Sequence, residues 1–157
     1  MHDWRLSGLD PASFEPLFAW SDDALSRIGA LRRTASEVPG FPCRVSLEDA
    51  PLGAELLLLP YEHHPASSPY RASGPIFVAR AAQRRALDAG EVPGYVTRRL
   101  ISLRAYDADA MMIEASVCEG PGVAAALDGL FGDRAVDYVH LHFAKRGCFS
   151  CLASRAG

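Results

Sequence analysis

Two strand-like runs in the second half of this chain lie close enough together to form a hairpin. Residues 98–106 and 111–118 are rich in apolar side chains, and only the short segment from Asp107 to Ala110 separates them. A link of this length joins antiparallel strands, because parallel strands need a crossover of a dozen or more residues. The hairpin therefore predicts a sheet that is largely antiparallel.

Similar runs recur along the rest of the chain. Strands are expected at residues 3–9, 30–38, 43–47, 55–61, 75–80, 138–143 and 148–154. Helices are expected to begin at Asp10, Ser21 and Pro121, which are typical first residues of helices, and another is expected over 81–89. Most links are too short for parallel crossovers. We therefore predict an α+β fold, a single domain over residues 1–157 with a largely antiparallel sheet and two to four short helices.

Charge and hydropathy exclude several classes of function. The 16 basic and 19 acidic side chains give a formal net charge of −3, so we expect no nucleic acid as a partner. No apolar run approaches the roughly 20 residues that span a bilayer, and the first residues lack an apolar signal-peptide core. We expect a cytoplasmic protein with no membrane partner, whose four cysteines are thiols rather than disulfides.

Six segments spread along the chain carry a resemblance to a known family. They are residues 7–10, 39–47, 61–63, 69–77, 103–107 and 139–142. On these segments the chain resembles the bacterial family called domain of unknown function 1203, over nearly its full length. The resemblance implies no particular activity, because the family has none assigned.

Two histidines lie two positions apart in the expected strand near the C-terminus. Successive side chains of a strand point to opposite faces, so Tyr138, His140 and His142 share one face. Neighbouring imidazoles can ligate a metal, exchange protons or bind an anion. Zinc or another divalent metal needs a third ligand, for which His63 is the candidate, whereas His64 is expected to point away. The alternative is that no metal binds, with one histidine hydrogen-bonded in the core and the other solvated.

Arginines and a polar loop predict an anion pocket. Guanidinium groups bind carboxylates and phosphates through two hydrogen bonds, and loop N–H groups add further donors. The candidate ligand-binding residues are Arg44, Arg71, Ser73 and Arg104. The alternative is that Arg71 pairs with an acidic residue such as Glu62 or Asp107 and only fixes the loop.

The last two cysteines have the C-x-x-C spacing of redox pairs. Cys148 and Cys151 are not followed by the βαβ pattern of such proteins, and in a strand their sulfur atoms face opposite sides. Cys148 alone is a candidate nucleophile, which His142 or His140 would activate. His142 and Cys148 are therefore the candidate catalytic residues.

These patterns lead to two main hypotheses. The first is a small-molecule binding or catalytic domain with a pocket of histidine, arginine and cysteine, whose partner is a small anionic molecule. The second is a non-catalytic interaction or accessory module, including a homodimer formed through an exposed sheet edge. A thiol-redox protein is a third, weaker alternative. The sequence slightly favours the first hypothesis and leaves open whether the protein is an enzyme.

Overall fold

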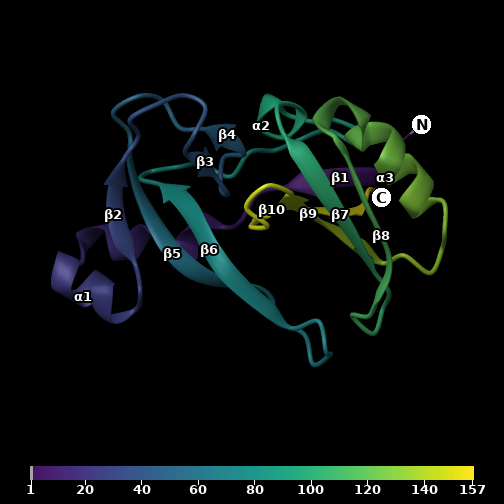
Figure 1. Ribbon diagram of the computed structural model, residues 1–157, viewed down its shortest axis with the longest axis horizontal. Coiled ribbons are helices and arrows are strands. Elements are labelled where there is room, and N and C mark those ends of the chain that lie inside the picture. Colours follow the sequence, from purple (N-terminus) through teal and green to yellow (C-terminus); the bar gives the residue numbers. More distant parts are fainter. Residues whose placement is uncertain (1) are drawn as a thin grey trace.

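Residues 2–157, which the computed structural model describes, form two five-stranded sheets (Figure 1). The first sheet has the order β1-β10-β9-β7-β8, with β1 at Trp4–Ser7, β7 at Leu100–Tyr106, β8 at Met112–Glu119, β9 at Tyr138–Phe143 and β10 at Phe149–Arg155. The second has the order β2-β5-β6-β3-β4, with β2 at Leu31–Thr34, β3 at Pro42–Cys43, β4 at Glu48–Asp49, β5 at Glu55–His64 and β6 at Ala72–Ala79. Within these residues only β3 and β6 pair in parallel. The predicted α+β class with largely antiparallel pairing is confirmed, whereas the division into two sheets was not predicted.

The helices are short. They are α1 at Asp22–Arg27, α2 at Gly94–Thr97 and α3 at Val123–Phe131, with 3-10 turns η1 at Pro11–Ser13, η2 at Glu15–Ala19 and η3 at Gly120–Gly122. α1 begins as expected at Ser21, whose hydroxyl accepts a hydrogen bond from the backbone N–H of Ala24. No helix in the described part of the chain has the length and apolar character needed to cross a bilayer.

The helix expected over residues 81–89 does not form, and that prediction is wrong. Residues 83–88 are irregular and run close to the N-terminal strand. There the guanidinium of Arg84 donates to the carbonyl of Gly8, and the N–H of Gly90 donates to the carbonyl of Trp4. These contacts with β1 and the burial of Leu87 override the local helix propensity.

Each sheet has its own apolar core. In the first sheet, one face of β9 packs Val139, Leu141 and Phe143 into a cluster that includes Leu127 and Phe131 of α3. In the second sheet, β5 and β6 pack against the N-terminal turns in a separate cluster. The predicted alternation of β9 is confirmed, and its polar face, which carries Tyr138, His140 and His142, lies outside both clusters.

β5 extends beyond the predicted end at Tyr61 and brings two histidines with it. Tyr61 pairs with Gly74 and His64 pairs with Ala72, so β5 carries one extra residue between these pairs, a β-bulge. β2 pairs with β5 only as far as Leu58, so the missing N–H of Pro60 falls where β5 has a free edge. The strand therefore continues to His64 and reaches the polar face of the first sheet.

Buried polar contacts tie the two sheets together. Arg44 is only 2% exposed and donates from Nε to the carbonyl of Phe149 and from Nη1 to the carbonyl of Pro42, each at 2.8 Å. Arg98 and Arg99 both pair with the buried carboxylate of Asp49. Such ties hold the polar region between the sheets in a fixed arrangement.

Candidate functional site

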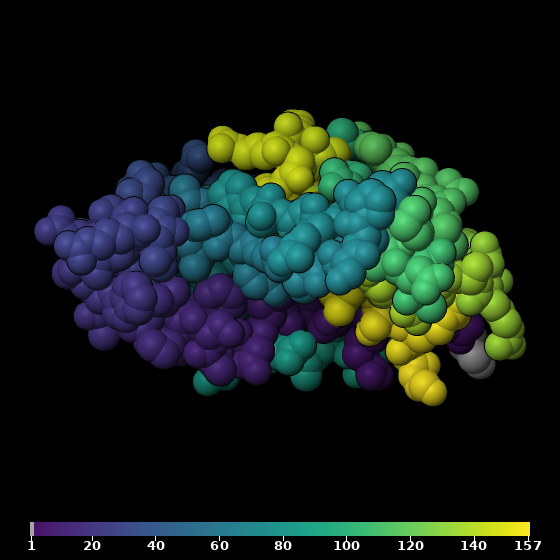
Figure 2. Space-filling model, turned by 90° about the horizontal axis from the view of Figure 1, so that it is seen from below, coloured from purple at the N-terminus to yellow at the C-terminus, as the bar shows by residue number. Residues whose placement is uncertain are grey.

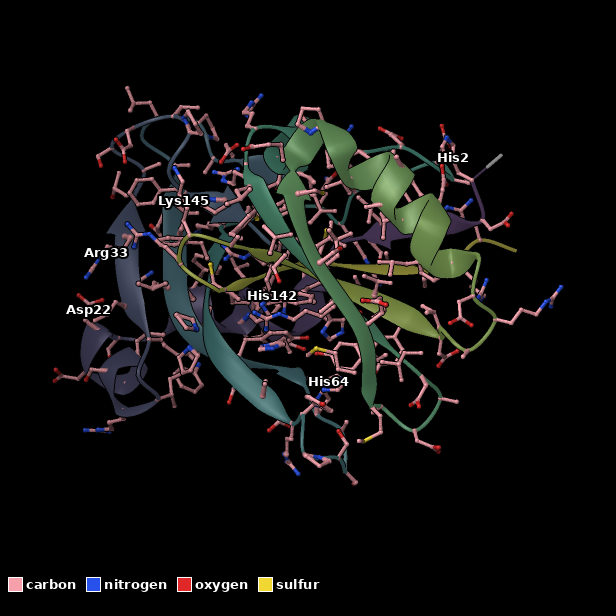
Figure 3. The ribbon with its side chains drawn as sticks, turned by 45° about the vertical axis from the view of Figure 1, so that its right-hand side comes forward. His2, Asp22, Arg33, His64, His142 and Lys145 are labelled. Atoms are coloured by element: carbon pink, nitrogen blue, oxygen red, sulfur yellow. The ribbon has the colours of Figure 1, made fainter. Side chains whose placement is uncertain are left out.

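The polar face of the first sheet presents nine side chains in three rows. Residues directly opposite each other on antiparallel strands share a face. From β7 across β9 to β10, the rows are Ser102, His142 and Phe149; Arg104, His140 and Leu152; and Tyr106, Tyr138 and Ser154. β5 places His63 and His64 over this face, and Figure 3 shows His142 and His64 in the region between the sheets. The ring centroids of His63 and His142 are 4.9 Å apart, and those of His64 and His140 are 5.2 Å apart.

His140 lies at the centre of these rows and has an unpartnered nitrogen. Its side chain is 5% exposed, and no described residue hydrogen-bonds its Nδ1. Burial, reinforced by the neighbouring imidazoles and by Arg104, lowers the pKa of His140 to about 3. Nδ1 of His63 is also buried without a partner among residues 2–157, and burial also lowers the pKa of His63. Both imidazoles are therefore neutral at neutral pH and have hydrogen-bonding capacity left over.

His142 has a defined tautomer that directs one nitrogen toward Arg104. Its Nδ1 lies 2.9 Å from the carbonyl of Gly147, so Nδ1 carries the hydrogen and Nε2 the lone pair. Nη1 of Arg104 lies 3.5 Å from that Nε2. Burial lowers the pKa of His142 to about 4; the Gly147 carbonyl opposes this shift, and the charge of Arg104 adds to it.

Arg104 is a partly buried cation without a counter-charge. Its only polar side-chain contacts within residues 2–157 are the one to His142 and a 3.3 Å contact from Nε to the hydroxyl of Ser102. Arg98 and Arg99 differ from it, because they share the carboxylate of Asp49. Buried Arg44 also lacks a carboxylate partner among these residues, but its N–H groups are taken up by the carbonyls of Pro42 and Phe149 and by Cys148. Arg104 therefore has guanidinium N–H groups for which the described side chains supply no carboxylate acceptor.

A tyrosine and a histidine form a second polar pair at the edge of this face. The hydroxyl of Tyr138 donates to Nε2 of His64 at 2.5 Å, and Nδ1 of His64 donates to the carbonyl of Tyr70 at 2.8 Å. Burial raises the pKa values of Tyr138 and Tyr106. The expectation that His64 points away is wrong, because the bulge in β5 lets both histidines reach the first sheet.

An open cleft with a volume of about 600 Å³ lies beside these groups. Its lining includes His63, His64, Tyr138, His140, Pro65 and Leu152. In Figure 2, which views the molecule from below, the teal end of the β5–β6 hairpin lies against the green and yellow parts of the first sheet. His63 and His140, whose Nδ1 atoms are buried and unpartnered, are therefore among the residues that line the cleft, whereas Arg104 is not.

Of the four predicted ligand-binding residues, only Arg104 faces the imidazoles. Arg71 is exposed and pairs with Glu62 through Nε and Oε2 at 3.2 Å, as the alternative interpretation predicted. Ser73 is exposed on β6, beside a different hollow that Leu31 and Pro75 also line. Arg44 is buried, and its N–H groups are directed to the carbonyls of Pro42 and Phe149 and to a cysteine.

The cysteines do not join the imidazole cluster. Sγ of Cys148 lies 3.1 Å from Nη2 of Arg44, and within residues 2–157 it forms no hydrogen bond with His140 or His142. All four cysteines are free, and burial raises the pKa of Cys151 to about 12. The structure thus gives no support to a Cys148–Cys151 redox pair.

The histidines are close together but are not arranged as a metal centre. Among the described residues, no group of three or more histidine, cysteine or acidic side chains is placed to hold a metal ion. The ring centroid of His140 lies 6.0 Å from that of His63 and 6.3 Å from that of His142. A metal on His63, His140 and His142 therefore stays a prediction, and the adjacent charge of Arg104 disfavours a cation there.

The fold and site define a class of protein with two largely antiparallel sheets and a polar, imidazole-rich face between them. Residues 40–155 match the family described as "Protein of unknown function (DUF1203)", and the chain belongs to this family. The resemblance seen in the sequence is thereby confirmed, and the matched range contains every residue of the three rows. No curated protein and no solved structure matches the chain.

Proposed function

We propose that this protein binds a small anion, a carboxylate or a phosphate, at Arg104 between the two sheets. The observation that carries the proposal is a partly buried guanidinium without a carboxylate partner in residues 2–157, beside imidazoles that burial keeps neutral. A guanidinium binds carboxylate and phosphate oxygens through paired, charge-assisted hydrogen bonds. An anion there would supply the counter-charge that no described side chain provides.

The imidazoles have distinct roles in this proposal. His142, held by the Gly147 carbonyl, accepts from Arg104 and orients the guanidinium. His63 and His140 each have a nitrogen to spare, so each can donate an N–H to the anion. A bound anion favours the protonated imidazole, so it raises the low pKa of His140 and binds more tightly as the pH falls.

Anion titration of two arginine variants tests the proposal. Inorganic phosphate and acetate are titrated into the wild type, Arg104→Gln and Arg71→Gln by calorimetry or NMR. Arg71→Gln is the matched control, because Arg71 is exposed and already paired with Glu62. We expect Arg104→Gln to lose binding and Arg71→Gln to keep it; equal binding by all three proteins would refute the proposal.

A second candidate function is self-association through β8. This strand forms an edge of the first sheet, and Ile113 and Val117 on it are 41% and 60% exposed. It contains no proline, and its only charged side chains are Glu114 and Glu119. Sedimentation at several concentrations tests this candidate: a dimer that Val117→Lys abolishes would support it, and a monomer at all concentrations would exclude it.

A further inference from the structure

The pair formed by Tyr138 and His64 has the order of contacts of a hydroxyl nucleophile with its base. The carbonyl of Tyr70 can only accept a hydrogen bond, so its 2.8 Å contact places the hydrogen of His64 on Nδ1. Nε2 of His64 then holds the lone pair and accepts from the hydroxyl of Tyr138 at 2.5 Å. An imidazole that is oriented on one side and holds a hydroxyl on the other is the arrangement that activates such nucleophiles. Here a backbone carbonyl takes the place of the usual carboxylate.

Both side chains of the pair line the cleft of about 600 Å³. Tyr138 is half-buried, and His64 is 3% exposed. The phenolic oxygen of Tyr138 gives its only hydrogen to His64, and no donor among residues 2–157 contacts its lone pairs. The oxygen therefore keeps the electron pairs with which a nucleophile forms a bond.

The hydroxyl of Tyr138 depends on a base for its reactivity. Burial raises the pKa of Tyr138, and Tyr106 and the carboxylates of Asp137 and Asp107 raise it further. The phenol is therefore protonated at neutral pH, and its proton must be removed as it reacts. His64 is the one described residue that receives this proton through a direct hydrogen bond.

The lining of the cleft favours an uncharged molecule. Asp137 and Arg155 are the only carboxylate and guanidinium among the lining residues, and their charges are opposite. Leu152 and Pro65 add apolar surface to the same lining. The cleft thus differs from the surroundings of Arg104, which is not among its lining residues.

We infer that Tyr138 is an acyl acceptor, that His64 is its base, and that the cleft takes uncharged esters. The phenolic oxygen attacks the carbonyl carbon of the ester, and its proton passes to Nε2 of His64. The bond between that carbon and the alcohol oxygen then breaks, and the alcohol leaves with the proton from His64. The acyl group remains on Tyr138. Esters of phenols or of more acidic alcohols are the suitable class, because their alcohol leaves at least as readily as the tyrosine oxygen.

Acylation by p-nitrophenyl acetate tests the inference. This ester is uncharged and releases coloured p-nitrophenolate when it transfers its acetyl group. We expect a burst of p-nitrophenolate equal to the protein concentration, and an acetyl group on Tyr138 in fragment spectra of the tryptic peptide that follows Arg134. Lys145, the only lysine of the chain, is the internal competitor. Acetylation of Lys145 without Tyr138, or no acetylation at all, would overturn the inference.

Three variants separate the nucleophile from its base. Tyr138→Phe removes the hydroxyl alone and should abolish the burst. Tyr70→Phe is the matched control, because Tyr70 is also half-buried and the variant keeps the carbonyl that orients His64. His64→Gln can still accept from the Tyr138 hydroxyl but cannot take its proton.

The stability of His64→Gln distinguishes a base from a structural partner. Its urea unfolding midpoint should stay close to that of the wild type, while acylation of Tyr138 slows about 100-fold. Acylation of His64→Gln at the wild-type rate, or a burst that Tyr138→Phe retains, would contradict the inference. Neither result bears on the proposed anion site, which the titrations of Arg104→Gln test separately.

Discussion

Acid should destabilise this protein through its buried neutral imidazoles. The pKa of His140 falls from 6.5 to about 3 in the folded protein, and that of His142 falls to about 4. Between pH 6 and pH 5 the unfolded chain therefore binds protons at these two positions and the folded protein does not. Stability thus rises with pH, and integrating the linkage relation gives a loss of about 1.2 kcal/mol per histidine, or about 2.4 kcal/mol for both, on going from pH 6 to pH 5.

The variant His140→Phe isolates one of the two contributions. Urea unfolding at pH 7, 6 and 5 measures the free energy of unfolding of both proteins. The variant should lose about 1.2 kcal/mol less than the wild type between pH 6 and pH 5. At pH 7 it should be at least as stable, because an unpartnered buried polar group costs about 1–3 kcal/mol and phenylalanine has none.

Two results would refute this reasoning. An unchanged pH dependence in His140→Phe would mean that His140 is protonated in the folded protein. A loss of more than about 2 kcal/mol at pH 7 would mean that its imidazole makes a stabilising hydrogen bond. His2→Gln is the control for replacing a histidine outside the buried cluster. His2 is exposed, and its side chain contacts the carboxylate of Asp128.

Three further predictions concern the contacts around the site. Arg44→Met should lower the free energy of unfolding, measured with urea, by about 2–4 kcal/mol, because it leaves the buried carbonyls of Pro42 and Phe149 without their donor. Arg33→Met is the control, and it should change the free energy of unfolding little because Arg33 is exposed. Tyr138→Phe should cost about 1 kcal/mol by removing the hydrogen bond to His64, and an unchanged unfolding midpoint would argue against that bond. In the native protein an alkylating reagent should modify Cys148 before Cys151, which is 1% exposed; mass spectrometry of the two peptides decides this, and the reverse order would contradict the burial.

Local pattern was enough to predict the elements that carry the site. The alternation in β9 correctly separated Tyr138, His140 and His142 from the apolar side chains, because a strand has a fixed period of two. The short link at Asp107 correctly indicated the antiparallel β7–β8 hairpin. Both features depend on residues that are near each other in the sequence.

What the sequence did not show depends on long-range pairing. Arg104 faces His140 because β7 pairs with β9 in one particular register, and no local signal distinguishes Arg104 from Arg71. His64 joins the cluster because of a bulge in β5 that only the pairing with β6 reveals. The division into two sheets was also missed, because strand-like runs do not show which strands pair with each other. Two strands of the second sheet are moreover only two residues long, too short to show a pattern.

The central claim is that Arg104 and its neighbouring imidazoles form an anion site. Its most direct test is to follow the imidazole ¹⁵N chemical shifts of His140 and His142 through a pH titration, with and without saturating phosphate. The account predicts that phosphate raises their pKa values from about 3 and about 4, and that Arg104→Gln removes this effect. Identical titration curves with and without phosphate would contradict it.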